Sequence, residues 1–294
     1  MTRSSQVLWH TSMAQRPLHY ATNMNTTNTK TPAVLERQLR ILELLAQHPA
    51  GLAFGEIHRE LDLPKATLHR LLSGLAYARC LDADPPLHDT DDSIATSRRI
   101  YWLGARIRGM LAAAVSPDRM ATLSQGILHE LVDQFHETAF LGMLRGTRIE
   151  SIMMATPPKD WYGYVNPGHV MPPQAAASAK AILAFQDEDL LRQIYTDPIP
   201  ALTPKTLTTQ DALRHELATV RRTGIAWCRE EIDLGLVAVA APIPLAQLGV
   251  IFSVSLVGPS ERMKQHDEAA ITQALQTAAS RLSSIYARQL NVET

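Results

Sequence analysis

The sequence predicts an α+β protein with two folded domains, a small and mostly helical domain followed by a larger domain around one antiparallel sheet. Its 294 residues, 46% of them hydrophobic, supply enough apolar side chains for about two cores. Apolar residues recur with a helical period as far as residue 75, and beyond residue 115 helical and strand-like patterns alternate. Strands flanked by separate helices indicate an antiparallel sheet on which helices pack. This composition excludes a chain that is disordered throughout.

Charge and cysteine content exclude several classes of protein. The 28 basic and 29 acidic side chains nearly balance, which excludes a histone-like protein with a wholly basic surface but allows a local basic one. Cys80 and Cys228 lie far apart in the chain, and neither has a partner at metal-ligand spacing. We therefore expect no disulfide framework, no zinc ribbon and no cofactor, in a protein of the reducing cytoplasm.

Two segments lack an ordinary globular pattern. Residues 1–31 are rich in Thr, Asn and Ser, contain no acidic residue and lack the apolar stretch of a secretory signal, so we expect a disordered tail. Residues 234–260 carry no charge and are long enough to cross a membrane. However, Pro242 and Pro244 break this run, and its flanks are rich in Val and bounded by glycine. We expect two buried strands around a turn there, and no membrane association.

The N-terminal domain, residues 32–100, begins with three predicted helices. The first extends from Pro32 to His48, with an apolar stripe at helical spacing made of Leu35, Leu39, Leu42 and Ala46 and widened by Ile41 and Leu45. A second, short helix is indicated by Phe54, Ile57, His58 and Leu61. A three-residue turn at 62–64 then leads into a third helix that starts near Lys65.

The third helix has two contrasting faces. Its inner face is apolar and carries Leu68, Leu71, Leu72 and Leu75. Its outer face is polar and free of acidic residues, and it carries Lys65, Thr67, His69, Arg70 and Ser73. The major groove of DNA admits one α-helix, in which Arg can contact guanine and Ser, Thr or Lys can reach bases or phosphates. The pattern predicts a helix-turn-helix, although a merely solvated outer face has the same polarity.

A hairpin is expected directly after the three helices. Residues 81–83 and 94–100 have strand-like patterns around a polar segment at 85–93, which is typical of the wing of a winged helix. The wing is rich in aspartate, and aspartate repels phosphate. We therefore expect contacts to the DNA backbone at Arg98 or Arg99 rather than at the tip of the hairpin.

Four separated blocks of sequence carry a resemblance to a known family. They read GEIHRELDLPKATLHRLLSGL at 55–75, YWLGARI at 101–107, GIAWCREEIDLGLVAVAAPI at 224–243 and GVIFSVSLVGPSER at 249–262. Together they resemble the IclR family of bacterial transcriptional regulators. The resemblance implies a winged helix-turn-helix domain, a linker helix at 101–116 and a GAF-like effector-binding domain at 117–290.

The chain departs from the family pattern at two places. Segment 172–180 reads PPQAAASAK, with Gln174, Ala176 and Ala179 where the family usually has His, Thr and Gly. This departure concerns the effector chemistry rather than the fold. Arg79 stands where a glycine commonly ends the recognition region, so we expect a less tight turn into the wing.

The patterns beyond residue 115 predict the elements of the second domain. A first helix contains Leu123, Ile127, Leu131 and Phe135, and strands are expected at 138–144 and 148–155. Helices follow at 177–185, 187–195 and 210–222, the last ended by Gly224. Two more strands and a long final helix, with a stripe of Ile271, Leu275, Ala278, Leu282 and Ile285, complete the domain.

A small-molecule pocket is expected where small residues, 175–179, precede a helix, because free backbone N–H groups there suit an anion. The resemblance places pocket residues at Ala177, Ser178, Cys228, Ala238, Ser253 and Ser255. Trp161, with Tyr162 and Tyr164, forms an aromatic cluster just before this segment and could enclose an aromatic ligand. Core packing or a dimer surface explains the same cluster equally well. The hypothesis is an aromatic carboxylate or a related catabolic intermediate.

These observations predict a ligand-responsive, DNA-binding transcriptional regulator of a catabolic operon. The expected partners are double-stranded operator DNA, a small organic acid, further copies of the chain in a dimer or tetramer, and RNA polymerase if it activates. The linker residues Leu103, Ile107 and Leu111 are the candidate dimer surface. One alternative is a metabolite-sensing module that acts through protein partners. Another is a thiol enzyme using Cys228, which has no adjacent base, so we expect no enzyme.

Overall fold

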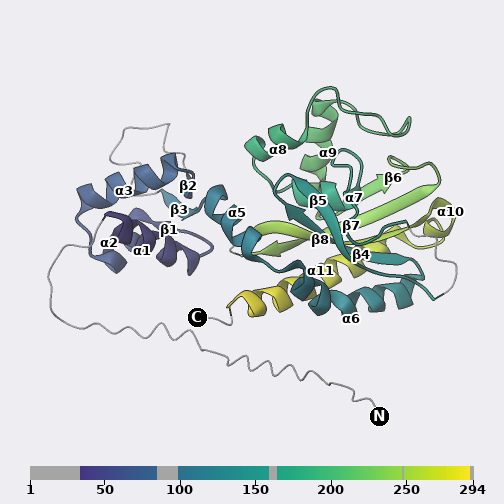
Figure 1. Ribbon diagram of the computed structural model, residues 1–294, viewed down its shortest axis with the longest axis horizontal. Coiled ribbons are helices and arrows are strands. Elements are labelled where there is room, and N and C mark those ends of the chain that lie inside the picture. Colours follow the sequence, from purple (N-terminus) through teal and green to yellow (C-terminus); the bar gives the residue numbers. More distant parts are fainter. Residues whose placement is uncertain (1–33, 85–98, 159–163, 247, 292–294) are drawn as a thin grey trace, which may run out of the picture.

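A computed structural model describes residues 34–84, 99–158, 164–246 and 248–291 and shows two domains joined by a helix (Figure 1). The expected tail at 1–31, the tip of the wing, Arg98, Trp161 and Tyr162 lie outside the described residues. Both domains combine helices with an antiparallel sheet, which confirms the α+β class.

The N-terminal domain is built from three helices and a small sheet. The helices are α1 (Val34–Ala46), α2 (Phe54–Leu61) and α3 (Lys65–Tyr77), and the strands are β1 (Leu52–Ala53), β2 (Leu81–Asp84) and β3 (Ile100–Leu103). The strands pair in the order β1-β3-β2. Asp62 ends α2 in the left-handed conformation and makes the tight turn into α3 that the sequence predicts. The four inner leucines of α3 are all buried.

Helix α1 buries a different side from the one that its apolar stripe predicts. Ile41 and Leu45 are its buried residues, whereas Leu35 and Leu39 are 64% and 44% exposed. The helix is apolar around more than half of its circumference, so periodicity alone does not determine which part faces the core. The difference leaves large apolar side chains on the surface of this domain.

The strand after the wing ends three residues later than predicted, so the linker helix also starts later. Residues 101–103 belong to β3, and Tyr101 is completely enclosed in the core of the N-terminal domain. The linker helix α5 (Ala105–Ala114) begins only after Gly104. Leu103 is buried in the N-terminal core and Ile107 packs against it, so neither is free to form the expected dimer surface, while Leu111 is exposed.

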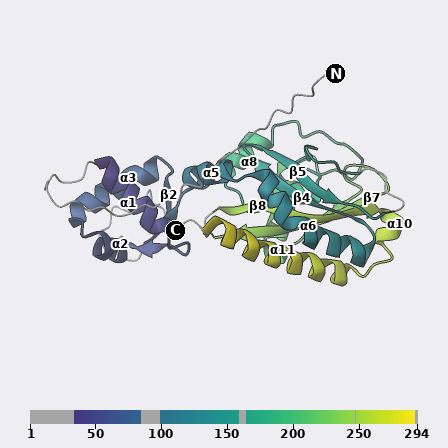
Figure 2. The ribbon, with the colours of Figure 1, turned by 60° about the horizontal axis from the view of Figure 1, so that its bottom comes forward.

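The C-terminal domain surrounds a five-stranded antiparallel sheet in the order β5-β4-β8-β7-β6. Its strands are β4 (Thr138–Arg145), β5 (Arg148–Ala155), β6 (Ala226–Arg229), β7 (Leu236–Leu245) and β8 (Gly249–Pro259). The long helices α6 (Pro117–Phe135) and α11 (Glu268–Asn291) lie side by side on one face (Figure 2). The opposite face carries α7 (Ala177–Leu183) and α9 (Gln210–Thr223), with α8 (Glu188–Ile194) beside them and the short α10 (Ser260–Met263) after β8.

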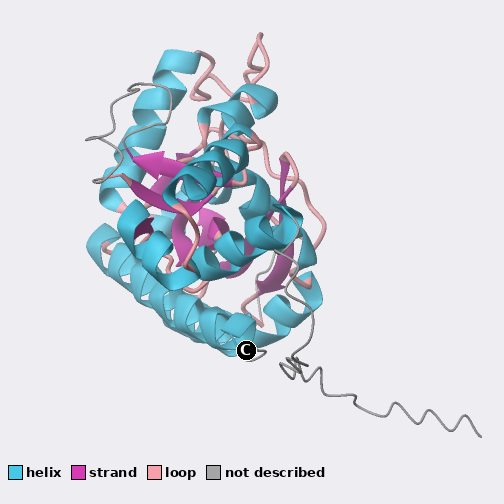
Figure 3. Ribbon diagram, turned by 90° about the vertical axis from the view of Figure 1, so that its left-hand side faces the viewer, coloured by secondary structure: helices cyan, strands magenta, loops and turns pink. Residues whose placement is uncertain are grey.

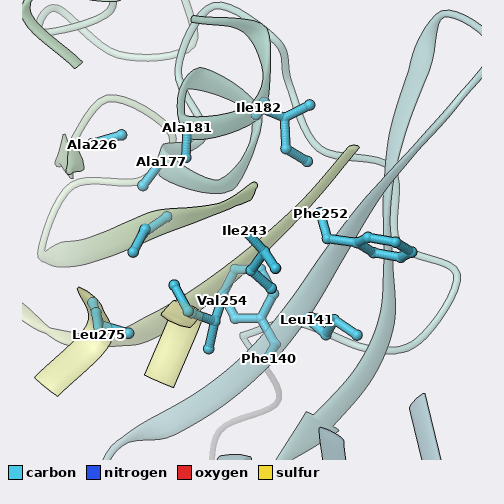
Figure 4. Close-up of a cluster of buried hydrophobic side chains, with 14 of the residues drawn as sticks. Phe140, Leu141, Ala177, Ala181, Ile182, Ala226, Ile243, Phe252, Val254 and Leu275 are labelled. Atoms are coloured by element: carbon cyan, nitrogen blue, oxygen red, sulfur yellow. The ribbon is translucent and has the colours of Figure 1, made fainter. Parts of the chain in front are cut away.

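Helices on both faces of the sheet enclose a continuous core (Figure 3). Figure 4 shows Ala177, Ala181 and Ile182 of α7 above the sheet and Leu275 of α11 on the other side. Alternation along β8 assigns Phe252 and Val254 to the face of α11, because the Phe252 ring meets the Tyr286 ring of that helix. Ser253 and Ser255 therefore face α7.

Two details of the sheet differ from the predictions. The turn between β7 and β8 comes after Leu245, so Pro242 and Pro244 lie inside β7 rather than in the turn. Strand β6 pairs with β7 only as far as Ala240, so the prolines occupy a stretch bonded on one side alone, where a missing N–H costs little. The strand β6 itself was not predicted, because four residues are too few for a periodic pattern.

The uncharged run at 234–260 forms β7 and β8, as expected. Within the described ranges, no helix combines the length and the hydropathy needed to cross a bilayer. The same ranges contain no group of three His, Cys, Asp or Glu side chains placed to hold a metal ion.

Candidate DNA-binding surface and effector pocket

The outer face of α3 is open to solvent along its length. Lys65, His69 and Arg70 are exposed, and Thr67 and Ser73 are half-buried. The leucines between them anchor the helix to the core, so the polar side chains project from a rigid support. None of the five side chains is enclosed by its own molecule, which is the condition for a recognition helix to enter a groove.

Arg99, which was expected to contact the DNA backbone, is buried in the structure. Arg99, which directly precedes β3, is only 2% exposed and hydrogen-bonds Tyr101 of that strand. The expected contact of Arg99 with the DNA backbone is therefore wrong for this conformation, because its guanidinium is not at the surface. Asp82 of β2 is paired with Arg108 of α5 at 3.2 Å, so these two charges largely cancel each other.

A small, mostly apolar cavity lies between α7, β4 and the segment that follows β6. Its volume is about 100 Å³, and four of the predicted residues line it, namely Ala177, Ser178, Cys228 and Ala238. Tyr164 of the predicted aromatic cluster also lines it. Sequence reasoning missed most of the apolar wall, which includes Phe140, Val165, Met171, Ile232, Leu236 and Val257. Alternation along β4 and β8 could have found Phe140 and Val257, because both face α7.

Two polar side chains stand at the mouth of the cavity. His169 and Asp233 line it, and both are exposed to solvent. Asp233 was not predicted from the sequence. The cavity therefore has an apolar interior with a polar entrance, a common arrangement in ligand sites.

Ser253 and Ser255 do not line the cavity but lie deeper on the same face of the sheet. Both are completely buried, and among the described residues neither hydroxyl, nor that of Ser178, has a hydrogen-bond partner. A Cβ placed on Gly142 would lie 2.8 Å from the Ser253 Oγ and 3.3 Å from the Ser178 Cβ, so these two serines meet above Gly142. A buried hydroxyl without a partner costs about 1–3 kcal/mol, which indicates polar groups arranged for a ligand.

A buried lysine pairs with two carboxylates behind the pocket. The ammonium of Lys180 is completely buried and donates to Glu231 at 2.8 and 3.0 Å and to Glu216 at 3.0 Å. Burial raises the pKa of Glu231, and the charge of Lys180 opposes that rise. Burial also raises the pKa of the Cys228 thiol, which is the opposite of what an activated nucleophile requires.

Comparison with known proteins identifies the chain. The family model for the IclR helix-turn-helix domain matches residues 34–85. The family model for the C-terminal domain of bacterial IclR transcriptional regulators matches residues 112–284, which is more than half of the chain. The chain belongs to the IclR family. The resemblance inferred from the four sequence blocks is thereby confirmed.

Individual IclR regulators are identical to this chain at about a quarter of the aligned positions. The chain is 28% identical to the HTH-type transcriptional regulator XynR of Escherichia coli, over 85% of this chain and 95% of that one. It is 27% identical to the probable transcriptional regulator SauR of Cupriavidus necator, over 79% and 88%. An IclR transcriptional regulator from Alicyclobacillus acidocaldarius, 26% identical, superposes with a TM-score of 0.51 over 87% of this chain and 99% of that one.

These findings establish the general role of the protein. It is a transcriptional regulator of the IclR type with an N-terminal helix-turn-helix domain and a C-terminal ligand-binding domain. The families and relatives are regulators rather than enzymes, in agreement with the expectation from the sequence.

Proposed function

We propose that this IclR regulator binds a double-stranded operator through the outer face of α3 and controls a catabolic operon in response to a small organic acid. The observation that carries the proposal is the exposure of Lys65, His69 and Arg70 above a fully buried inner face of α3. A single winged helix reads one half-site, so we propose that a homodimer or tetramer binds two half-sites. If the protein activates, RNA polymerase is a further partner.

The proposed effector is a small acid with one aromatic ring. Its carboxylate would extend past Ser178 beyond the cavity wall and accept hydrogen bonds from the hydroxyls of Ser178, Ser253 and Ser255, which have no other described partner. Its ring would contact Phe140 and the other apolar groups of the wall. The cavity of about 100 Å³ is smaller than most ligand sites, which limits the acid to a single ring.

The polar entrance favours a particular orientation of this acid. Asp233 would repel a carboxylate, whereas the deeper serines carry no charge, so the carboxylate points inward. A ring hydroxyl at the opposite end would lie near His169 and Asp233. An IclR homolog from Microbacterium hydrocarbonoxydans, 20% identical, was crystallised with 4-hydroxybenzoate, so this acid belongs among the compounds to be tested.

Two measurements test the proposal. A gel shift with the region upstream of the protein's own gene should show a specific complex, and absence of any complex would favour the module that acts through protein partners. Calorimetry with benzoate, 4-hydroxybenzoate, glyoxylate and pyruvate should show binding of an aromatic acid that Ser253→Ala weakens. Binding of glyoxylate alone would contradict the aromatic effector and leave the DNA-binding role intact.

A further inference from the structure

Arg79 adopts a backbone conformation that disfavours its own side chain. Its φ of 58° lies in the left-handed region, which glycine adopts at the lowest cost. The residue follows the C-terminal end of the recognition helix α3 and precedes β2. A strained residue at such a junction is evidence for a role of its side chain.

The backbone of Arg79 is held by the elements on both sides. Its N–H donates to the carbonyl of Ala76 in α3 at 2.8 Å, and its own carbonyl accepts from the N–H of Arg106 in α5 at 3.1 Å. The Arg106 side chain also donates to the carbonyl of Ala78. Because the end of the recognition helix and the start of the linker helix share these bonds, they move as one unit.

The side chain of Arg79 reaches the other domain. Its guanidinium forms an ion pair with Asp189 of α8, whose carboxylate also pairs with Arg192 one turn further on. The pair spans a cleft of about 800 Å³ that residues of both domains and of α5 line. A cleft of this size means that close packing does not fix the relative position of the two domains at this place.

Helix α8 is connected to the effector pocket through α7. It directly follows α7, whose first residues Ala177 and Ser178 line the cavity. In the turn between the two helices, Gln186 donates to the carbonyls of Ile182 in α7 and Val250 in β8, at 3.0 and 2.6 Å. Asp187 caps the N-terminus of α8. The turn therefore offers a route by which a shift of α7 over the pocket would reach Asp189.

We propose that Arg79 is a positioning residue, which couples the effector pocket to the recognition helix through its ion pair with Asp189. This inference deepens the proposed function and rests on it. An effector that moves α7 moves α8, and the ion pair forms in one arrangement of the domains and opens in another. The pair is exposed, so it shifts the balance between the arrangements by about five-fold at most.

A double-mutant cycle on DNA affinity tests the proposal. The variants are Arg79→Ala, Asp189→Ala and the double variant, titrated by fluorescence anisotropy with a labelled duplex from the gene's own upstream region. We expect both single variants to change the affinity in the same direction by about two- to five-fold, and the double variant to add nothing. Glu188→Ala removes an equal charge from the same helix, where the partner is Arg214, and should leave the affinity unchanged.

The outcomes separate coupling from a direct phosphate contact. If Arg79→Ala weakens binding equally with or without Asp189, and Asp189→Ala is neutral or strengthens binding, Arg79 only contacts DNA and the proposal is wrong. Unchanged affinity in all three variants also overturns it. A wild-type protein that does not bind the duplex would instead contradict the proposed function. Melting temperatures confirm that each variant is folded.

Hydrogen exchange provides a second readout, which requires no identified effector. Linkage is reciprocal, so binding of the duplex to the N-terminal domain should change amide exchange across α7 and α8 in the wild type. Arg79→Ala should abolish this change, and the exchanged pair of Arg79→Asp with Asp189→Arg should restore it. A change in exchange that persists in Arg79→Ala would refute the coupling role.

Discussion

Arginine and lysine residues have different roles at different positions in this protein, because some are exposed and others are buried. Arg70 lies exposed on α3, whereas Arg99 is enclosed beside Tyr101. Lys65 is free to approach a phosphate, whereas Lys180 is held in the interior by Glu231 and Glu216. A buried charge needs its partners to offset desolvation, so Lys180 contributes to the structure and not to ligand binding.

Replacing Arg70 by alanine should weaken binding to the specific operator by about 1–3 kcal/mol, because a side chain that contacts base edges is lost. Footprinting and anisotropy titrations with the upstream duplex measure the loss. Arg40→Ala on α1 removes the same charge from an exposed position and serves as the control. Equal affinities of the Arg70 variant and the wild type would exclude Arg70 from the interface.

The two cysteines should react with thiol reagents at different rates. Burial raises the pKa of Cys228, so a smaller fraction is thiolate at a given pH, and the rate of alkylation should rise only as the pH approaches that higher value. Cys80 is half-buried and should be modified first at pH 8. Mass spectrometry after iodoacetamide treatment assigns each site. Faster modification of Cys228 than of Cys80 would contradict the burial of that thiol.

At the scale of elements, the pocket results from the packing of α7 against β4 and β8. Gly142 of β4 leaves the space in which Ser178 of α7 and Ser253 of β8 meet. Four of the seven residues of α7 are Ala or Ser, which allows that helix to lie close to the sheet. The same three elements therefore supply both the core and the deep end of the proposed ligand site.

Gly142→Ala should destabilise the protein by about 1–3 kcal/mol and abolish effector binding, because the added methyl would lie 2.8 Å from the Ser253 Oγ. Chemical unfolding and calorimetry measure the two effects. Gly126→Ala on α6 is the matched control, since nothing lies within 4 Å of its added methyl. That variant should gain up to about 1 kcal/mol of stability from helix propensity. Normal effector binding by the Gly142 variant would place the ligand elsewhere.

At the scale of the whole molecule, the recognition helix and the ligand pocket lie in different domains that α5 connects (Figure 1). Communication between them therefore depends on the position of one domain relative to the other. The exposed apolar side chains Leu35 and Leu39 of α1 and Met110 and Leu111 of α5 lie on the DNA-binding half and on the linker helix. Leu35 and Leu39 lie one turn apart on the same face of α1, and this exposed apolar face suits a second copy of the chain.

Leu39→Glu should shift the protein towards monomers, because it places a charge within this apolar surface. Sedimentation velocity across a range of concentrations measures the shift. Operator affinity should fall with it, since a monomer binds only one half-site. Arg40→Gln is the control and should leave the oligomer intact, because Arg40 is exposed but points about 100° away from Leu39 around the helix. An unchanged oligomer in Leu39→Glu would exclude α1 from the interface.

The sequence alone determined the class of the protein and most of its elements. Helical periods and glycine or proline boundaries located α2, α3, α6 and α11 closely, because each buries a regular stripe against a core. Motif blocks identified the family and four residues that line the cavity. Each of these properties can be recognised from residues that lie close together in the sequence.

Only the tertiary structure decided which side chains share a surface. Whether Arg99 is buried, which side of α1 faces the core, and whether Leu103 is free depend on contacts between segments far apart in sequence. The meeting of Arg79 with Asp189, more than a hundred residues away, depends on the same kind of contact. Periodicity reports that a face is apolar but not what it packs against, so the ion pair between the domains became visible only in three dimensions.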